Sequence, residues 1–187
     1  MKEDNNSSLL NPDSSLLMTL PPRNDTETEI FAHYDFPEGV LEFDGQEFAF
    51  PAGIHAEASA KWLEESLLLV EISIEAQADA PCARCLKTAR LEISGSLEYL
   101  YYLQGAEAFD GFDDYMPVEV EYFGRVMDIM PQVHESIFTL LPTKVLCRED
   151  CKGLCPNCGK DLNEGACSCV NEVADPRLEA LRDYNVE

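Results

Sequence analysis

The most reactive side chains of this sequence are its eight cysteines, most of which lie near the carboxyl end. The segment CKGLCPNCGKDLNEGACSC, residues 151–169, contains five of them, and Cys147 precedes it by a few residues. Two more, Cys82 and Cys85, stand far upstream in PCARCL. Cysteines at such spacings form disulfides, carry out redox chemistry or bind a metal ion.

The cellular compartment that the sequence indicates argues against disulfides. No run approaches the ~20 apolar residues of a membrane-spanning helix. Polar residues and a proline interrupt the short apolar pieces of residues 9–20, and the first thirty residues are too acidic for an organellar transit peptide. We therefore expect a cytoplasmic chain with no membrane association. Cytoplasmic thiols stay reduced, so disulfides are the weaker interpretation.

Two Cys-x-x-Cys pairs with four further cysteines in a reduced compartment indicate zinc, which takes four thiolate ligands at tetrahedral corners. In CPNCG, Pro156 stiffens the turn and Gly159 permits the positive φ that such turns often need. The spacings divide the eight cysteines into two sets. One folds locally around an ion: Cys155, Cys158, Cys167 and Cys169. The other would clip two distant segments together: Cys82, Cys85, Cys147 and Cys151.

Several alternatives to this arrangement stay open. Cys151 can exchange with a member of the other set, and a single site in place of two is also possible. Catalytic zinc usually leaves a coordination position open, whereas thiolates can fill every position here, so one or two structural zinc ions are favoured. An iron–sulfur cluster also uses four cysteines. A redox role for PCARC, in which Arg84 lowers a thiol pKa, is disfavoured because the pair joins predicted strands.

The elements that position these cysteines can be read from hydrophobic periodicity. Strands with one buried and one wet face are predicted where apolar residues alternate with polar ones, at residues 54–62, 70–80, 91–101 and 118–122. The second and third of these flank PCARCL, which places Cys82 and Cys85 in the connection of a hairpin. Residues 128–141 have helical periodicity, with Asp128 as the cap and Pro131 in the first turn. A short helix is expected at residues 175–184.

These elements predict an α+β fold, mainly an antiparallel β-sheet with a covering helix and a carboxyl-terminal Cys-rich zinc-binding segment. We expect one domain overall in three parts: a polar arm (1–29), a β-rich body (30–146) and the Cys-rich segment (147–187). Apolar side chains at residues 16–18 and 20 can pin the otherwise mobile arm to the body. Residues 104–115 are expected to form a solvated acidic loop without cation-site spacing, and His33, His55 and His134 are expected to be structural.

The order of these motifs resembles one known family. PCARCL after a long strand, a helix ending in LLPTKVLC, then REDCKGLCPNCGKDLNEGACSC and DPRLEALRDY are similar to the YceD family of large ribosomal RNA subunit accumulation proteins. The resemblance covers roughly residues 30–185. It implies a bacterial-type cytoplasmic protein with a role in the synthesis, processing or accumulation of 23S ribosomal RNA. It transfers no catalytic residues, only the cysteine pattern.

The leading hypothesis is therefore a non-catalytic ribosome-assembly factor, not an enzyme, that binds ribosomal proteins, processing factors or a pre-ribosomal particle. The formal charge of -23 disfavours non-specific binding to bare nucleic acid and favours basic partners. One basic patch for local RNA or partner contact is predicted, although its charges can equally offset the thiolates: Arg84, Lys87, Arg90, Lys144, Arg148 and Lys152. An RNA-processing enzyme and a thiol or zinc redox sensor are the alternatives.

Overall fold

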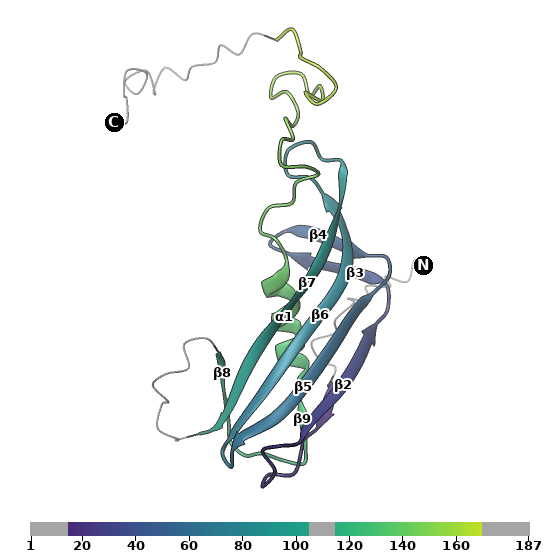
Figure 1. The fold of residues 1–187 in the computed structure, drawn as a ribbon. Helices are drawn as coiled ribbons and strands as arrows, with labels where there is room; N and C mark the ends of the chain where they lie inside the picture. The colour runs from purple at the N-terminus through teal and green to yellow at the C-terminus, as the bar shows by residue number, and fades with distance from the viewer. Residues whose placement is uncertain (1–14, 105–114, 170–187) are drawn as a thin grey trace, which may run out of the picture.

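A computed structural model describes residues 15–104 and 115–169 (Figure 1). The expected helix at residues 175–184 lies outside the described residues. The expected acidic loop also lies outside them, apart from residues 104 and 115 at its two ends. The described part is mostly antiparallel sheet with one short helix. The seven-stranded sheet contains β2 (Glu29–Phe36), β3 (Gly39–Phe43), β4 (Gln46–Phe50), β5 (Ile54–Glu64), β6 (Leu67–Pro81), β7 (Thr88–Leu103) and β8 (Met116–Val120). A separate two-stranded sheet joins β1 (Leu17–Thr19) to β9 (Val126–Asp128).

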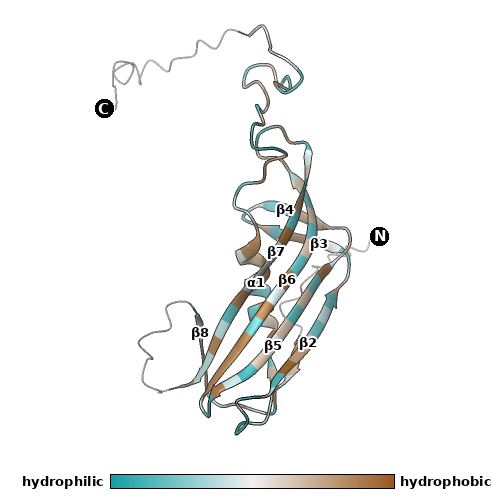
Figure 2. Ribbon diagram, in the orientation of Figure 1, coloured by the Kyte–Doolittle hydropathy of each residue, from teal (hydrophilic) through white to brown (hydrophobic). Residues whose placement is uncertain are grey.

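The long strands follow from the period-two pattern. β5, β6 and β7 alternate between apolar and polar residues, which Figure 2 shows as bands along each ribbon. Their inward residues are buried, as Ala58, Trp62 and Ile72 illustrate with at most 2% of their surface exposed. β6 pairs with β7 over its whole length, from Leu67 opposite Tyr102 to Pro81 opposite Thr88. This hairpin carries the chain from the body to the cysteines.

The sheet is mainly antiparallel as predicted, but one pair of strands is parallel and neighbouring strands do not follow the order of the sequence. β8 lies parallel to β7, and β4 pairs with β6 and not with the next strand in sequence. A parallel neighbour requires a connection of about a dozen residues or more, and residues 104–115 supply one. The β3–β4 hairpin turns at Asp44 and Gly45, which have φ values of 52° and 73°. Positive φ at both positions is what a two-residue type I′ turn requires.

Helix α1 (Met130–Leu140) lies against β6 and β7. It buries Val133 and Ile137 in the main apolar core, and the hydroxyl groups of Tyr99 and Ser136 hydrogen bond at 2.9 Å. Gly95 of β7 provides space for this packing, since a Cβ there would lie 2.6 Å from Leu140 Cδ2. The helix therefore approaches the sheet closely here, and a side chain at this position would require the Leu140 side chain to move.

The start of α1 differs slightly from the prediction. Its N-cap is Ile129, which has no side-chain cap. Asp128 stands one residue earlier, where its carboxylate accepts the N–H groups of Leu16 (2.9 Å) and Met130 (3.0 Å). The same side chain thus ties the amino-terminal segment to the helix start. Met18 and Leu20 are buried in the body, as expected for the residues that attach this segment to it. Leu17 was also expected to be buried, but its side chain is 63% exposed.

Candidate metal centre

The turn at the tip of the β6–β7 hairpin presents Cys82 and Cys85. The N–H of Cys82 donates to the carbonyl of Lys87, and the N–H of Leu86 donates to the carbonyl of Cys82, both at 2.9 Å. Leu86 has a φ of 61°, in the left-handed region that a side chain disfavours. Its side chain is 67% exposed. We call this turn, residues 82–87, the first knuckle.

Residues 155–160 form a second knuckle with the same backbone hydrogen bonds. The N–H of Cys155 donates to the carbonyl of Lys160 (2.8 Å), and the N–H of Gly159 donates to the carbonyl of Cys155 (2.9 Å). Gly159 has a φ of 71° at the position that Leu86 occupies in the first knuckle. Here the glycine takes the left-handed conformation without a side-chain penalty, as its position in CPNCG predicted.

The eight sulfur atoms form two groups of four. Within each group the sulfurs lie no more than 4.8 Å apart: Cys82, Cys85, Cys147 and Cys151 in the first group, and Cys155, Cys158, Cys167 and Cys169 in the second. In the first group, Sγ of Cys82 lies 3.9 Å from Sγ of Cys151. In the second, Sγ of Cys155 lies 3.3 Å from Sγ of Cys167. This grouping coincides with the partition predicted from the spacings.

The geometry of both groups fits a tetrahedral metal ion. Zn–S bonds of about 2.3 Å place two tetrahedral sulfur ligands about 3.8 Å apart. The separations given above, and the 3.6 Å between Cys85 and Cys147, scatter about that value. They are far longer than the ~2.05 Å of a disulfide bond. Each group therefore supplies four thiols around one point and could hold a metal; the identity of the ion stays a prediction.

The two groups differ in their exposure to solvent. Three cysteines of the first group are buried, and Leu146 and Leu154 pack against them. In the second group only Cys155 is buried, while Cys158 is exposed. The first group thus has a small apolar shell and the second lies close to solvent, which makes the second the more accessible to chelators.

Backbone N–H groups favour a thiolate in each knuckle. Burial raises the pKa of Cys82, but N–H groups of Arg84, Cys147 and Cys85 lower it to about 6. N–H groups of Cys158 and Asn157 lower the pKa of Cys155 to about 6. Burial and the neighbouring sulfurs raise the pKa of Cys147 to about 12. Four adjacent thiolates repel one another, so full deprotonation of the group requires a cation among them.

Two backbone hydrogen bonds join the first knuckle to residues on either side of Cys147 and Cys151. The N–H of Ala83 donates to the carbonyl of Val145 (2.8 Å), and the N–H of Leu154 donates to the carbonyl of Arg84 (3.1 Å). Gly153 lies at this junction with a φ of 74°, and a Cβ there would be 2.9 Å from the Arg84 oxygen. Only a glycine therefore lets the two backbones approach this closely.

This junction gives a prediction with a matched control. Gly153→Ala and Gly159→Ala both place a side chain at a similar positive φ, which costs about 1–2 kcal/mol, but a Cβ at Gly159 would meet nothing within 4 Å. Gly153→Ala is therefore expected to cost a further ~1–3 kcal/mol from the collision with Arg84. The measurement is amide hydrogen exchange of residues 151–162, which should accelerate more in Gly153→Ala. Equal exchange in the two variants would show that the junction is not tightly packed.

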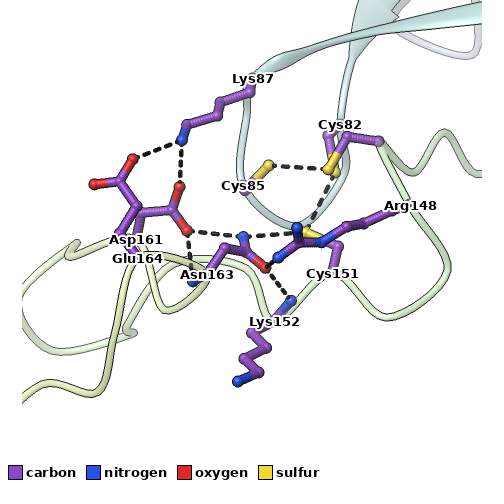
Figure 3. Close-up of polar contacts among 10 residues, drawn as sticks. Cys82, Cys85, Lys87, Arg148, Cys151, Lys152, Asp161, Asn163 and Glu164 are labelled. Atoms are coloured by element: carbon purple, nitrogen blue, oxygen red, sulfur yellow. Dashed lines mark hydrogen bonds and ion pairs between the residues drawn. The ribbon is translucent and has the colours of Figure 1, made fainter.

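Asn163 contacts the first cysteine group and was not among the predicted site residues (Figure 3). Its amide nitrogen lies 3.5 Å from Sγ of Cys151, and its Oδ1 accepts the N–H of Lys152 at 2.8 Å. Asp161 fixes this side chain by accepting both the backbone N–H (2.8 Å) and the side-chain amide (2.7 Å) of Asn163. The Asp-x-Asn sequence is a signal for such a turn, in which a carboxylate accepts the N–H two residues on.

Four of the six residues of the predicted basic patch contact other parts of the chain. Arg84 donates to the carbonyls of Glu149 (3.2 Å) and Cys151 (2.7 Å). Lys87 lies between carboxylates of Asp161 (2.7 Å) and Glu164 (2.9 Å), as Figure 3 shows. Asp161 first, then Glu164, raises the pKa of Lys87, and Lys87 lowers the pKa of Asp161 to about 2.

The other members of the patch divide into paired and unpaired side chains. Arg90 makes two contacts with Asp79, at 2.9 and 3.0 Å, across the β6–β7 ladder. Arg148 donates to Oδ1 of Asn163 at 2.7 Å. The ammonium groups of Lys144 and Lys152 have no ion-pair partner within residues 15–104 and 115–169. The contacts of the paired members are with carboxylates, backbone carbonyls and an amide oxygen, and both interpretations of the patch stay predictions.

The three histidines lie away from both cysteine groups. His33 pairs with Glu57 (3.0 Å) and His55 with Asp35 on the surface strands β2 and β5. His134 stacks against Phe138 within α1, with ring centroids 4.5 Å apart. Of the residues that the structure describes, only the cysteines form groups that could hold a metal.

Comparisons with known proteins place these features in a family. Residues 70–184, more than half of the chain, match the family model described as large ribosomal RNA subunit accumulation protein YceD. Uncharacterized proteins of Mycobacterium bovis and Mycobacterium tuberculosis are each 31% identical over 118 residues, which is 61% of this chain and 54% of the relative. The chain thus spans about half the length of these curated relatives. No solved structure matches it.

In the described residues, no helix has both the length and the apolarity to cross a membrane. The matched region includes both knuckles and all eight cysteines, and the chain belongs to the YceD family.

Proposed function

We propose that this chain is a non-catalytic factor for the synthesis, processing or accumulation of 23S ribosomal RNA, and that it works in the cytoplasm. Membership of a family named for accumulation of the large ribosomal RNA subunit carries this proposal. Ribosomal proteins, processing factors or a pre-ribosomal particle are its partners, and the strongly acidic composition suits basic ones.

We further propose that each cysteine group holds one structural zinc ion. Four thiolates saturate a tetrahedral ion, so no position is left for the activated water of catalytic zinc. No histidine or carboxylate joins either group in the described residues. A bound ion would hold the first knuckle against residues 147–151 and close the second knuckle on Cys167 and Cys169. The chain, including α1 as the cover of the sheet, then acts as one rigid domain.

The functional proposal is tested by the ratio of mature 23S to 16S ribosomal RNA in a strain that lacks the gene. We expect this ratio to fall and a plasmid copy of the wild-type chain to restore it. Affinity capture of the tagged full chain is expected to retrieve large-subunit precursors. An unchanged ratio together with capture of no ribosomal component contradicts the proposal.

Two further measurements address the alternatives. Incubation of the zinc-loaded protein with precursor 23S RNA is expected to give no cleavage products, whereas cleavage would indicate a processing enzyme. Mild peroxide is expected to leave partner capture unchanged. Zinc release accompanied by lost capture would instead indicate a redox sensor.

A further inference from the structure

A cavity of about 430 Å³ lies at the end of the sheet opposite the cysteines. Three segments form it: residues 19–23 at and after the end of β1, Trp62 near the end of β5, and residues 123–125 before β9. Its volume is in the ~300–1,000 Å³ range of small-ligand pockets. Its floor is apolar, and its charged side chains are Arg23 and Arg125.

Trp62 gives this cavity a fixed aromatic floor. Only 2% of its surface is exposed, and its Nε1–H donates to the Pro21 carbonyl at 2.9 Å. The Phe123 ring meets it edge-on, with centroids 4.9 Å apart. The Arg23 guanidinium lies over both rings, 5.7 Å from the Trp62 centroid and 5.4 Å from the Phe123 centroid. Arg23 is exposed, so its guanidinium contacts the rings and stays accessible to solvent.

The charge of this cavity is opposite to that of the chain. Neither Arg23 nor Arg125 forms an ion pair with a described carboxylate, whereas Arg90 and Arg148 do. Glutamate lines each of three other cavities of the described residues, through Glu42, Glu57 or Glu75. No acidic residue lines this one. In a chain with a formal charge of -23, two unpaired guanidinium groups at an apolar cavity favour an anionic ligand there.

We propose that this cavity binds one nucleotide of single-stranded RNA. The ligand must be both planar and anionic. A nucleobase stacks on the exposed Arg23 guanidinium, which the Trp62 and Phe123 rings support from below, and its phosphate pairs with Arg125. An acidic peptide would supply the charge but no planar group for the stack. This proposal rests on the ribosomal RNA role proposed above and names the RNA-contacting surface.

Trp62 also provides the readout, because it is the only tryptophan in the sequence. Its fluorescence in the full-length protein is titrated with a single-stranded octanucleotide, an RNA duplex of the same length and a poly-glutamate peptide. We expect the single strand to quench the emission and the other two to have little effect. Because one phosphate is neutralised, log affinity should fall against log salt with a slope of about −0.7.

Variants separate the stack from the ion pair. Arg23→Gln and Arg23→Lys are both expected to lower the affinity at least about tenfold, since a lysine cannot stack as a plane. Arg125→Gln should weaken binding and flatten the salt slope, and Arg125→Lys should restore most of both. Arg90→Gln, at the other end of the sheet, is the control and should bind as the wild type does. Circular dichroism of each variant confirms that it is folded.

Three results would overturn the proposal: no response to the single strand, equal binding of the peptide, or unchanged affinity in Arg23→Gln. These outcomes are distinct from failure of the proposed function. If the gene deletion lowers the 23S ratio while the purified protein binds no single strand, the function holds and this site is rejected. If RNA binds but the deletion leaves the ratio unchanged, the ribosomal role fails.

Discussion

Replacing Cys82 with serine is expected to remove one of two bound zinc ions and to release residues 147–169 from the hairpin, while the sheet stays folded. Zinc binding contributes about 10–16 kcal/mol in small structural sites. Without it, the segment keeps only the polar contacts of Arg84, Lys87 and Leu154, because the apolar contacts at the first group come from Leu146, Leu154 and the cysteines themselves. The main core contains none of the cysteines. Loss of the metal should therefore detach residues 147–169 from the hairpin without unfolding the sheet.

Elemental analysis and hydrogen exchange together check this result. Wild-type protein should contain two equivalents of zinc, and Cys82→Ser one, with rapid exchange at the Leu154 amide, which donates to the Arg84 carbonyl. Cys158→Ser is the matched control. It should also lose one equivalent but keep the Leu154 amide protected, because only the second knuckle opens. Two equivalents in Cys82→Ser, or a protected Leu154 amide after loss of its zinc, would contradict the proposed attachment of the segment by the first group.

Trp62→Ala is expected to lower the free energy of unfolding by about 3–5 kcal/mol, as buried aromatic truncations do. Trp62 is the largest fully buried side chain. It also joins three segments, since it lies in β5, donates to the Pro21 carbonyl and packs against Phe123. The substitution leaves a cavity in the core and an unpaired carbonyl at Pro21, and both effects act in the same direction.

Chemical denaturation followed by far-ultraviolet circular dichroism measures this change, because the variant has no tryptophan. Phe31→Ala is the control: its ring is 56% exposed on the edge strand β2, so truncation should change the stability by no more than about 0.5 kcal/mol. Trp62→Phe should fall between them, since it keeps most of the apolar volume and loses the hydrogen bond. A loss below about 1 kcal/mol in Trp62→Ala would show that this junction contributes little.

The parts of the fold that the sequence predicts are those specified by local pattern. β5, β6 and β7 are long and amphipathic, so the alternation from Ile54 to Tyr101 identifies them and places Cys82 at a hairpin tip. β3 and β4 are short, and their local signal is the Asp44-Gly45 pair, which is typical of a type I′ turn. The parallel pairing of β8 depends on the path of a long connection, which hydrophobic periodicity does not encode.

The candidate site also has features that follow from local sequence and features that depend on the tertiary structure. Spacing predicts the two groups that the structure brings together, because a Cys-x-x-Cys turn fixes two ligands locally, but it leaves open which group takes Cys151. The contacts of Asn163 with Cys151 and of Lys87 with Asp161 join residues far apart in sequence. No local pattern shows which carboxylate a lysine meets after folding. The sequence therefore shows which basic residues lie near the cysteines, but only the tertiary structure shows which carboxylates they pair with.

The length of β6 sets the distance between the Trp62 cavity and the cysteines at the two ends of the sheet. At about 3.3 Å per residue, a strand of fifteen residues extends about 50 Å. Trp62 stands opposite Leu68 near one end of β6, and Cys82 follows the other end. The hairpin contains no hinge between them, since β7 pairs with β6 throughout. Two molecules that bind at the opposite ends are therefore held at a fixed separation, as by a spacer.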